Sequence, residues 1–166
     1  ARVEMWHDGA SQSRGAMKHV HPEQDEALAV RDGVLGVWHD SETHRLSAGE
    51  SHTIPAGDPH QFWNAGDDEV RVVGEVRPAL QTEAFMYITY GLNGDVPVTP
   101  SGMPINPLRL APVIDEFDNL LYLSMIPIWI QKIGVQAVAP FGRLLGYDSD
   151  YPEYIPDERT RCLNTS

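Results

Sequence analysis

The sequence predicts a mainly β protein, a sandwich or barrel of short strands, followed by α-helices. Three observations favour this class. Runs of β-branched, aromatic and aliphatic residues recur about every eight to twelve residues through the first half of the chain. Turn sequences separate these runs, and helical periodicity begins only after residue 78. A parallel sheet would need a crossover helix between successive strands, so an antiparallel sandwich or barrel is expected.

Turn sequences bound each expected strand. Asp32-Gly33 and Pro55-Ala56-Gly57 are the clearest of them, because Gly accepts the positive φ that tight turns require. The expected strands are residues 2–7, 16–21, 26–31, 34–39, 43–46, 51–54, 60–64 and 70–76.

The second half of the chain is expected to be helical. Thr82 can cap a short helix that ends at Tyr90, although the β-formers in this run leave a strand as the alternative. Prolines and glycines then predict a connector up to residue 106. The expected organisation is a β-barrel over 1–78, this helix or strand with its connector over 79–106, a helical hairpin over 107–147 and a tail over 148–166.

Two longer helices follow from hydrophobic spacing. Apolar residues three and four apart predict an amphipathic helix over 107–125. Pro127 suits the first turn of a second helix, and Pro140 is expected to kink that helix or end it early. We expect this hairpin to pack on the barrel or on a second subunit.

Composition and charge exclude several classes of partner. The chain has 166 residues, the size of one domain, and a net charge of −12. Nucleic acid and anionic membrane surfaces are therefore not expected as partners, because binding to phosphate groups needs clustered Lys and Arg. No membrane span is expected either, since Pro127, Lys132, Pro140 and Arg143 interrupt the apolar stretch over 120–147.

The chain has one cysteine, Cys162, which excludes an intramolecular disulfide. The fold therefore does not depend on an oxidising compartment, and a cytoplasmic protein is expected.

Histidines and acidic residues form the most informative pattern. His19 and His21 alternate, so on a strand both side chains point to the same face. Glu26 follows a turn at Pro22, and His60 follows the turn at 55–57. Three neutral imidazoles and a carboxylate would make a nitrogen and oxygen ligand set for a metal. The alternate histidines alone are a weak signal, and Asp25 is the alternative carboxylate if the register slips.

Two stretches of the chain resemble the two motifs of the cupin superfamily. Residues 19–33 match the first motif, His-x-His, four residues, Glu, six residues and Gly, and residues 49–64 match the second, in which a Pro-x-Gly turn precedes a His and an Asn. The matching residues are His19, His21, Glu26, Gly33, Gly49, Pro55, Gly57, His60 and Asn64. The chain departs from the pattern at Ser13, where the first motif normally opens with Gly. The chain is most similar to small single-domain cupins that carry a helical C-terminal extension.

This resemblance implies a double-stranded β-helix, or jelly-roll, barrel with a metal ion held by His19, His21, Glu26 and His60. The ligand types favour a divalent transition metal, with iron(II) expected first and Mn, Ni, Zn, Co or Cu as alternatives. A divalent ion beside one carboxylate keeps a net positive charge, so the expected substrate is a small anionic or enolisable molecule. A homodimer is the common arrangement in the family.

We therefore expect a metal-dependent oxygenase of the dioxygenase type, acting on a small molecule that chelates the metal. Four protein ligands leave about two positions open on an ion that prefers six, enough for a bidentate substrate. The alternatives are a non-oxidative isomerase, lyase or cyclase, and a sensor module that binds a metal or small molecule without catalysis.

Three further residues are candidates for lining the pocket. His52 is a candidate acid or base, although an exposed or hydrogen-bonded histidine is the simpler interpretation. Phe62 has the same parity as His60 on its strand, and Trp38 is a third candidate, although aromatic residues in barrel strands are usually core. We expect His39 and His44, which flank the turn at 40–42, to face solvent.

Overall fold

The computed structural model describes residues 1–7, 17–99 and 103–155, and only the backbone of residues 2–7. All eight expected strands are present, most within a residue of the expected bounds, and a ninth, not expected, follows at 122. Of the expected strand 16–21, only His19–Val20 is a strand, and residue 16 lies outside the described residues. The strands are β1 (Arg2–His7), β2 (His19–Val20), β3 (Asp25–Asp32), β4 (Val34–His39), β5 (Glu42–Ser47), β6 (Ser51–Ile54), β7 (His60–Asn64), β8 (Val70–Arg77) and β9 (Tyr122–Leu123).

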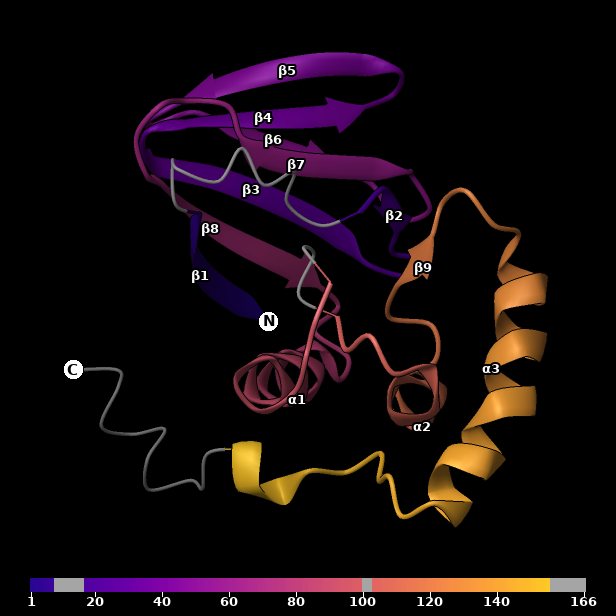
Figure 1. Ribbon diagram of the computed structural model, residues 1–166. Helices are drawn as coiled ribbons and strands as arrows, with labels where there is room; N and C mark the ends of the chain where they lie inside the picture. Colours follow the sequence, from indigo (N-terminus) through magenta and orange to yellow (C-terminus); the bar gives the residue numbers. More distant parts are fainter. Residues whose placement is uncertain (8–16, 100–102, 156–166) are drawn as a thin grey trace. The chain divides into compact units, whose positions relative to one another are not determined.

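The strands form two antiparallel sheets, which agrees with the predicted mainly β, double-stranded β-helix fold (Figure 1). One sheet has the order β1-β8-β3-β6 and the other has the order β5-β4-β7-β2-β9. Sequential strands therefore alternate between sheets, as β3 and β4 do across the turn at Gly33, except that β4 and β5 are neighbours in one sheet. At this turn φ is +76°, and a Cβ would lie 2.6 Å from the carbonyl oxygen of Glu69, so both the backbone angle and the close approach require glycine.

The hydrophobic core lies between the two sheets. Alternate residues of β3 and β7 are buried, which is the period-two pattern of strands with one face inward. Each fully buried aliphatic side chain contributes about 1.5–3 kcal/mol of transfer free energy. This stabilisation offsets the cost of burying a few polar side chains in the same interior. The core cluster comprises Leu28, Val30, Leu35, Val37, Leu46, Ile54, Phe62, Val70 and Val72.

The chain divides into two compact units. One contains Ala1–Thr82 together with Asp118–Lys132, and the other contains Glu83–Phe117 together with the chain from Ile133 onward. The segment 118–132 therefore belongs with the barrel strands.

The prediction of one helix over 107–125 is wrong. Helix α2 covers only Pro107–Glu116, and the side chain of Asn106 caps its start by accepting a hydrogen bond from the backbone N–H of Leu108. Asn119 then adopts a left-handed backbone conformation with φ of 72°, and β9 pairs with β2. Pairing with a distant strand thus overrides the helical spacing of the apolar residues.

The helix expected to end at Tyr90 is longer than the sequence predicts, and the helix that contains Pro140 does not end there. Helix α1 (Thr82–Asp95) passes through Gly91, which excludes the strand alternative and the early stop. A Cβ at Gly91 would lie 2.2 Å from the ring of Tyr154, so this glycine serves close packing within its unit. Helix α3 (Ile128–Leu144) contains Pro140 without ending there.

The tail contains the 3₁₀ turn η1 (Pro152–Tyr154), and residues 156–166 of the expected tail lie outside the described part of the chain. The packing of residues 107–147 on the barrel or on a second subunit stays a prediction. Among the helices in the described ranges, none combines the length and the apolar character needed to cross a membrane.

Candidate metal centre

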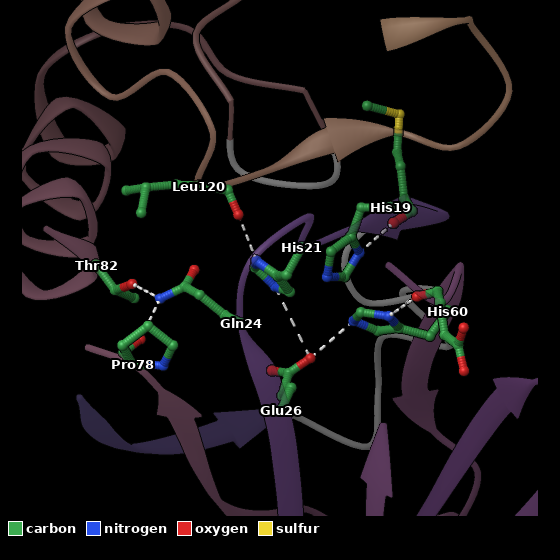
Figure 2. Close-up of polar contacts among 10 residues, drawn as sticks. His19, His21, Gln24, Glu26, His60, Pro78, Thr82 and Leu120 are labelled. Atoms are coloured by element: carbon green, nitrogen blue, oxygen red, sulfur yellow. Dashed lines mark hydrogen bonds and ion pairs between the residues drawn. The ribbon is translucent and has the colours of Figure 1, made fainter. Parts of the chain in front are cut away.

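Three histidines and one glutamate come together in the barrel interior. His19, His21, Glu26 and His60 each offer one ligand atom, and these atoms all lie within 4.8 Å of one another (Figure 2). All four residues are buried, and His60 is only 1% exposed. These are the four residues that the resemblance implies as metal ligands. We refer to them as the His/Glu cluster.

Both sheets contribute to the His/Glu cluster. His19 on β2 and His60 on β7 are direct partners in the antiparallel register, so their side chains share one face. Their ring centres are 4.2 Å apart. Glu26 lies on β3 of the other sheet and points across the interior, while His21 follows directly after β2. The cluster therefore depends on the packing of the two sheets against each other.

Backbone carbonyl groups set the orientation of all three imidazoles. In each ring, Nδ1 lies within hydrogen-bond distance of a carbonyl oxygen. A carbonyl oxygen can only accept, so Nδ1 carries the hydrogen and Nε2 keeps a lone pair available for a metal. The acceptors are Met17 at 2.8 Å from His19, Leu120 at 2.5 Å from His21 and Asp58 at 2.9 Å from His60.

The electrostatics favour neutral imidazoles beside an ionised carboxylate. Burial, assisted by His60 and His21, lowers the pKa of His19 to about 3, and burial also lowers the pKa of His21. Burial alone would raise the pKa of Glu26, but the contacts with His60 and His21 outweigh it and hold the pKa below its usual value. Near neutral pH His19 and His21 are thus neutral and Glu26 carries a negative charge.

Two buried polar atoms of the cluster lack a hydrogen-bond partner among the described residues. Oε2 of Glu26 lies 2.8 Å from Nε2 of His60 and 3.9 Å from Nε2 of His21. Within the described residues, neither Oε2 of Glu26 nor Nε2 of His60 has an aligned hydrogen-bond partner. With Nδ1 protonated on His60, both atoms present lone pairs to each other, which is unfavourable in a buried site. A cation between them would remove this conflict, so the residues fit a bound divalent metal.

The segment 118–132 contributes one of these carbonyl groups. β9 pairs with β2, which brings the carbonyl oxygen of Leu120 to His21. Gln131 fixes β9, because its side chain accepts from the backbone N–H of Leu123 at 3.0 Å and donates to the carbonyl oxygen of Leu123 at 2.8 Å. Leu120 was not predicted, since a backbone acceptor leaves no signature in its residue type.

Gln24 is a buried polar residue of the site that was also not predicted. It is 1% exposed and lies on the turn between His21 and Glu26 (Figure 2). Its Nε2 donates to the carbonyl oxygen of Pro78 and to the hydroxyl of Thr82, both at 2.8 Å. Gln24 therefore fastens the turn between two of the cluster residues to the end of β8.

Of the other residues proposed from the sequence for this site, one lies beside the His/Glu cluster and two do not. Phe62 is buried in the core with its ring centre 6.3 Å from that of His19, so it lies beside the cluster. Trp38 has the opposite parity to the buried Val37, so it lies on the outer face of its sheet, where Nζ of Lys18 is 3.4 Å from its ring centre. Asp25, the alternative carboxylate, instead accepts a hydrogen bond from the backbone N–H of Ala56.

The expectation that His39 and His44 face solvent is wrong. Asp40 and Ser41 both have positive φ, so a two-residue turn lets β4 and β5 pair up to their ends. The alternation of side chains therefore continues and turns both histidines inward. The side chain of His39 is only 12% exposed. His52 also points inward, and its Nε2 lies 3.0 Å from Nδ1 of His39.

Comparison with known proteins supports a cupin domain in the part of the chain that forms the barrel strands. The family model described as a cupin domain matches residues 3–74. The polyketide synthase CurC of Streptomyces cyaneus is 39% identical over 61 residues, which cover 37% of this chain and 40% of that protein. The probable oxidoreductase virH of Hypocrea virens is 25% identical over 157 residues, which cover 84% of this chain and 68% of that protein.

Among solved structures, a sugar phosphate isomerase from a cupin superfamily, from Silicibacter pomeroyi, shares 31% identity with a TM-score of 0.36. The match covers 44% of this chain and 46% of that one. The chain thus spans about two fifths of CurC and about two thirds of virH.

Proposed function

Because residues 3–74 of this chain are a cupin domain, we propose that the protein is a metal-dependent oxygenase of the dioxygenase type, acting on a small organic molecule that chelates the metal. The observation that carries the proposal is the buried His/Glu cluster, in which three oriented imidazoles and one carboxylate face each other. Such a donor set binds divalent transition metals.

Each residue of the cluster has a defined role in this proposal. His19, His21 and His60 would donate their Nε2 lone pairs, and Glu26 would supply the single negative charge. Iron(II) is the first choice of metal, before Mn, Ni, Zn, Co and Cu, because bound iron(II) supplies both oxygen chemistry and Lewis acidity. Phe62 would exclude water from one side of the cluster.

The charge at the centre supports a substrate class. A divalent ion with one carboxylate and three neutral imidazoles keeps a net charge of about +1, so an anionic oxygen ligand would bring it to neutrality. A carboxylate, an enol or a phenol meets this requirement. The printed names of the relatives fit the same class, because polyketides are rich in enolisable carbonyl groups and virH is named as an oxidoreductase.

A second candidate is non-oxidative isomerase, lyase or cyclase chemistry at the same cluster. The name of CurC, a polyketide synthase, is compatible with it, because that name implies no oxidation. The same residues would then hold a metal that only polarises a carbonyl group.

One experiment separates these candidates. The protein is purified without oxygen, its metal content is measured, and oxygen uptake and product formation are followed with a panel of catechols, 1,3-diketones and 2-hydroxy acids. Oxygen uptake that requires both metal and substrate supports the oxygenase. Product without oxygen uptake supports the second candidate, and bound metal without any turnover supports a sensor.

We also propose a homodimer through the exposed face of α3. Phe141 and Leu144 on this helix are 63% and 85% exposed, which is unusual for large apolar side chains. Residues 124–147 contain no Asp or Glu in a chain of net charge −12. Two copies would therefore repel each other least if they met through this segment.

A further inference from the structure

A second group of histidines lies in the same interior as the His/Glu cluster. It consists of one residue from each of three successive strands, β4, β5 and β6 (Figure 1). Each is paired in register with a residue that is 0–1% exposed, so each imidazole points to the interior face. The pairs are His39 with His60, His44 with Val37, and His52 with Leu28. We call His39, His44 and His52 the distal histidines.

Two of the distal histidines, one on each sheet, are strand neighbours of residues in the His/Glu cluster. His39 is directly opposite His60 across β4 and β7. His52 lies two residues before Ile54, the direct partner of Glu26, so His52 and Glu26 are diagonal neighbours on one face. Diagonal neighbours have their backbones about 7–8 Å apart. His52 is therefore one of the interior side chains next to Glu26 on this sheet.

Hydrogen bonds determine which nitrogen of His52 is free. Nε2 of His39 lies 3.1 Å from Oδ2 of Asp58, and an ionised carboxylate can only accept, so this Nε2 carries a hydrogen. Nδ1 of His39 is then the acceptor, and the hydrogen comes from Nε2 of His52 at 3.0 Å. This leaves Nδ1 of His52 with a lone pair, and Asp58 and His39 hold the ring in that tautomer.

We propose that His52 accepts the proton of an enol or phenol hydroxyl when such a molecule binds at the His/Glu cluster. The inference rests on the proposed function and narrows its substrate class to hydroxyl compounds that bind as oxyanions. In this step the O–H bond breaks, its proton bonds to Nδ1 of His52, and the electron pair stays on the oxygen. His39 and Asp58 act as positioning residues.

The surroundings of His52 suit a base. The titratable groups that face it are His39 from β4, His44 from β5, Glu26 diagonally from β3, and Asp58 beyond His39. Burial, followed by His44 and His39, lowers the pKa of His52, so the ring is neutral and able to accept a proton near pH 7. Its partial exposure leaves a path for the proton to return to water.

The test uses 4-nitrocatechol, whose absorption spectrum reports its ionisation, with protein loaded with zinc so that no oxidation occurs. Binding spectra are recorded against pH for the wild type, His52→Gln and His44→Gln. Gln at 52 can still donate to His39 but cannot accept the proton. We expect the ionisation midpoint of the bound catechol to rise by about one pH unit in His52→Gln. In His44→Gln, which removes a neighbour of His52 but keeps its hydrogen bond and its proton-accepting nitrogen, the midpoint should change much less than in His52→Gln.

Calorimetry in two buffers of different ionisation enthalpy gives a second readout. Wild-type protein should release about one proton fewer to the buffer on binding the catechol than His52→Gln does. The same midpoint and the same proton release in both proteins, each with full zinc content, would overturn the role of His52 alone. Wild-type protein that binds zinc but not the catechol would overturn the substrate class, and wild-type protein without stoichiometric zinc would overturn the proposed function itself.

Discussion

His19 and His60 lie directly opposite each other on β2 and β7, with ring centres 4.2 Å apart and each Nδ1 donating to a backbone carbonyl group. The register thus places both rings on one face, and the carbonyl groups turn both Nε2 atoms toward the interior. Glu26 meets them from the other sheet at 2.8 Å from Nε2 of His60. Folding of the barrel therefore brings the donor atoms of both sheets together.

Replacing Glu26 by Gln should abolish stabilisation by metal, because Gln has a similar shape but lacks the negative charge of the cluster. For the wild type, a free metal concentration about 100 times the Kd should add about 2.7 kcal/mol to the free energy of unfolding. For Glu26→Gln the increase should be close to zero. Thermal unfolding with and without Zn²⁺ measures both, and an equal increase in the two proteins would contradict a role for Glu26 in metal binding.

The metal-free protein should lose stability as the pH falls from about 6.5 to about 3. The pKa of His19 is about 3 in the folded protein and 6.5 in the unfolded chain, so in this window the unfolded chain binds a proton that the folded protein does not. Glu26, whose pKa is also lowered, adds a loss of the same sign below about pH 4.5. Urea unfolding between pH 3 and pH 8 measures the slope.

The variant His19→Gln provides the control for this pH dependence. It removes the group that titrates, so its free energy of unfolding should vary less between pH 6.5 and pH 4 than that of the wild type. Equal slopes in the two proteins would show that His19 is not held neutral by burial.

Replacing Gln131 by Ala should weaken metal binding from a distance. Its side chain makes two hydrogen bonds to the backbone of Leu123 and a third to Ile126, and so holds β9 against β2. Loosening β9 should release the Leu120 carbonyl from His21 and lower metal affinity by roughly tenfold. Gln136→Ala, on an exposed site of the same helix, is the matched control. Equal affinities in isothermal titration would count against the role of β9.

The double variant Phe141→Gln and Leu144→Gln should be monomeric if α3 forms the dimer interface. Both side chains are strongly exposed in the single chain, so polar replacements should leave its fold intact. Sedimentation velocity measures the oligomeric state of the wild type and of the variant. A wild-type monomer, or a variant that remains a dimer, would rule out this interface.

Local chemistry explains which parts of the fold could be predicted from sequence. Strands 51–54 and 60–64 were predicted at their observed bounds, because turn residues and alternation are properties of neighbouring residues. β9 could not be predicted, because Tyr122 pairs with Val20 about a hundred residues earlier and the helical spacing of 107–125 suggested another structure. The grouping of the four cluster residues was predicted through the motifs.

The orientations of the histidine side chains in the barrel were harder to predict from the sequence. The Leu120 carbonyl acts through the backbone, which carries no residue-specific signal. His39 and His44 were expected in solvent because they flank a turn, but the two-residue turn keeps the strands paired to their ends, so both side chains follow the alternation inward.

Metal content of purified protein tests the central claim most directly. Wild type and His44→Ala should each bind about one equivalent of Zn²⁺ or Fe²⁺ after loading without oxygen, and His60→Ala should bind essentially none while keeping the circular dichroism of a folded barrel. Full metal content in folded His60→Ala would contradict the assignment of the His/Glu cluster as the metal centre.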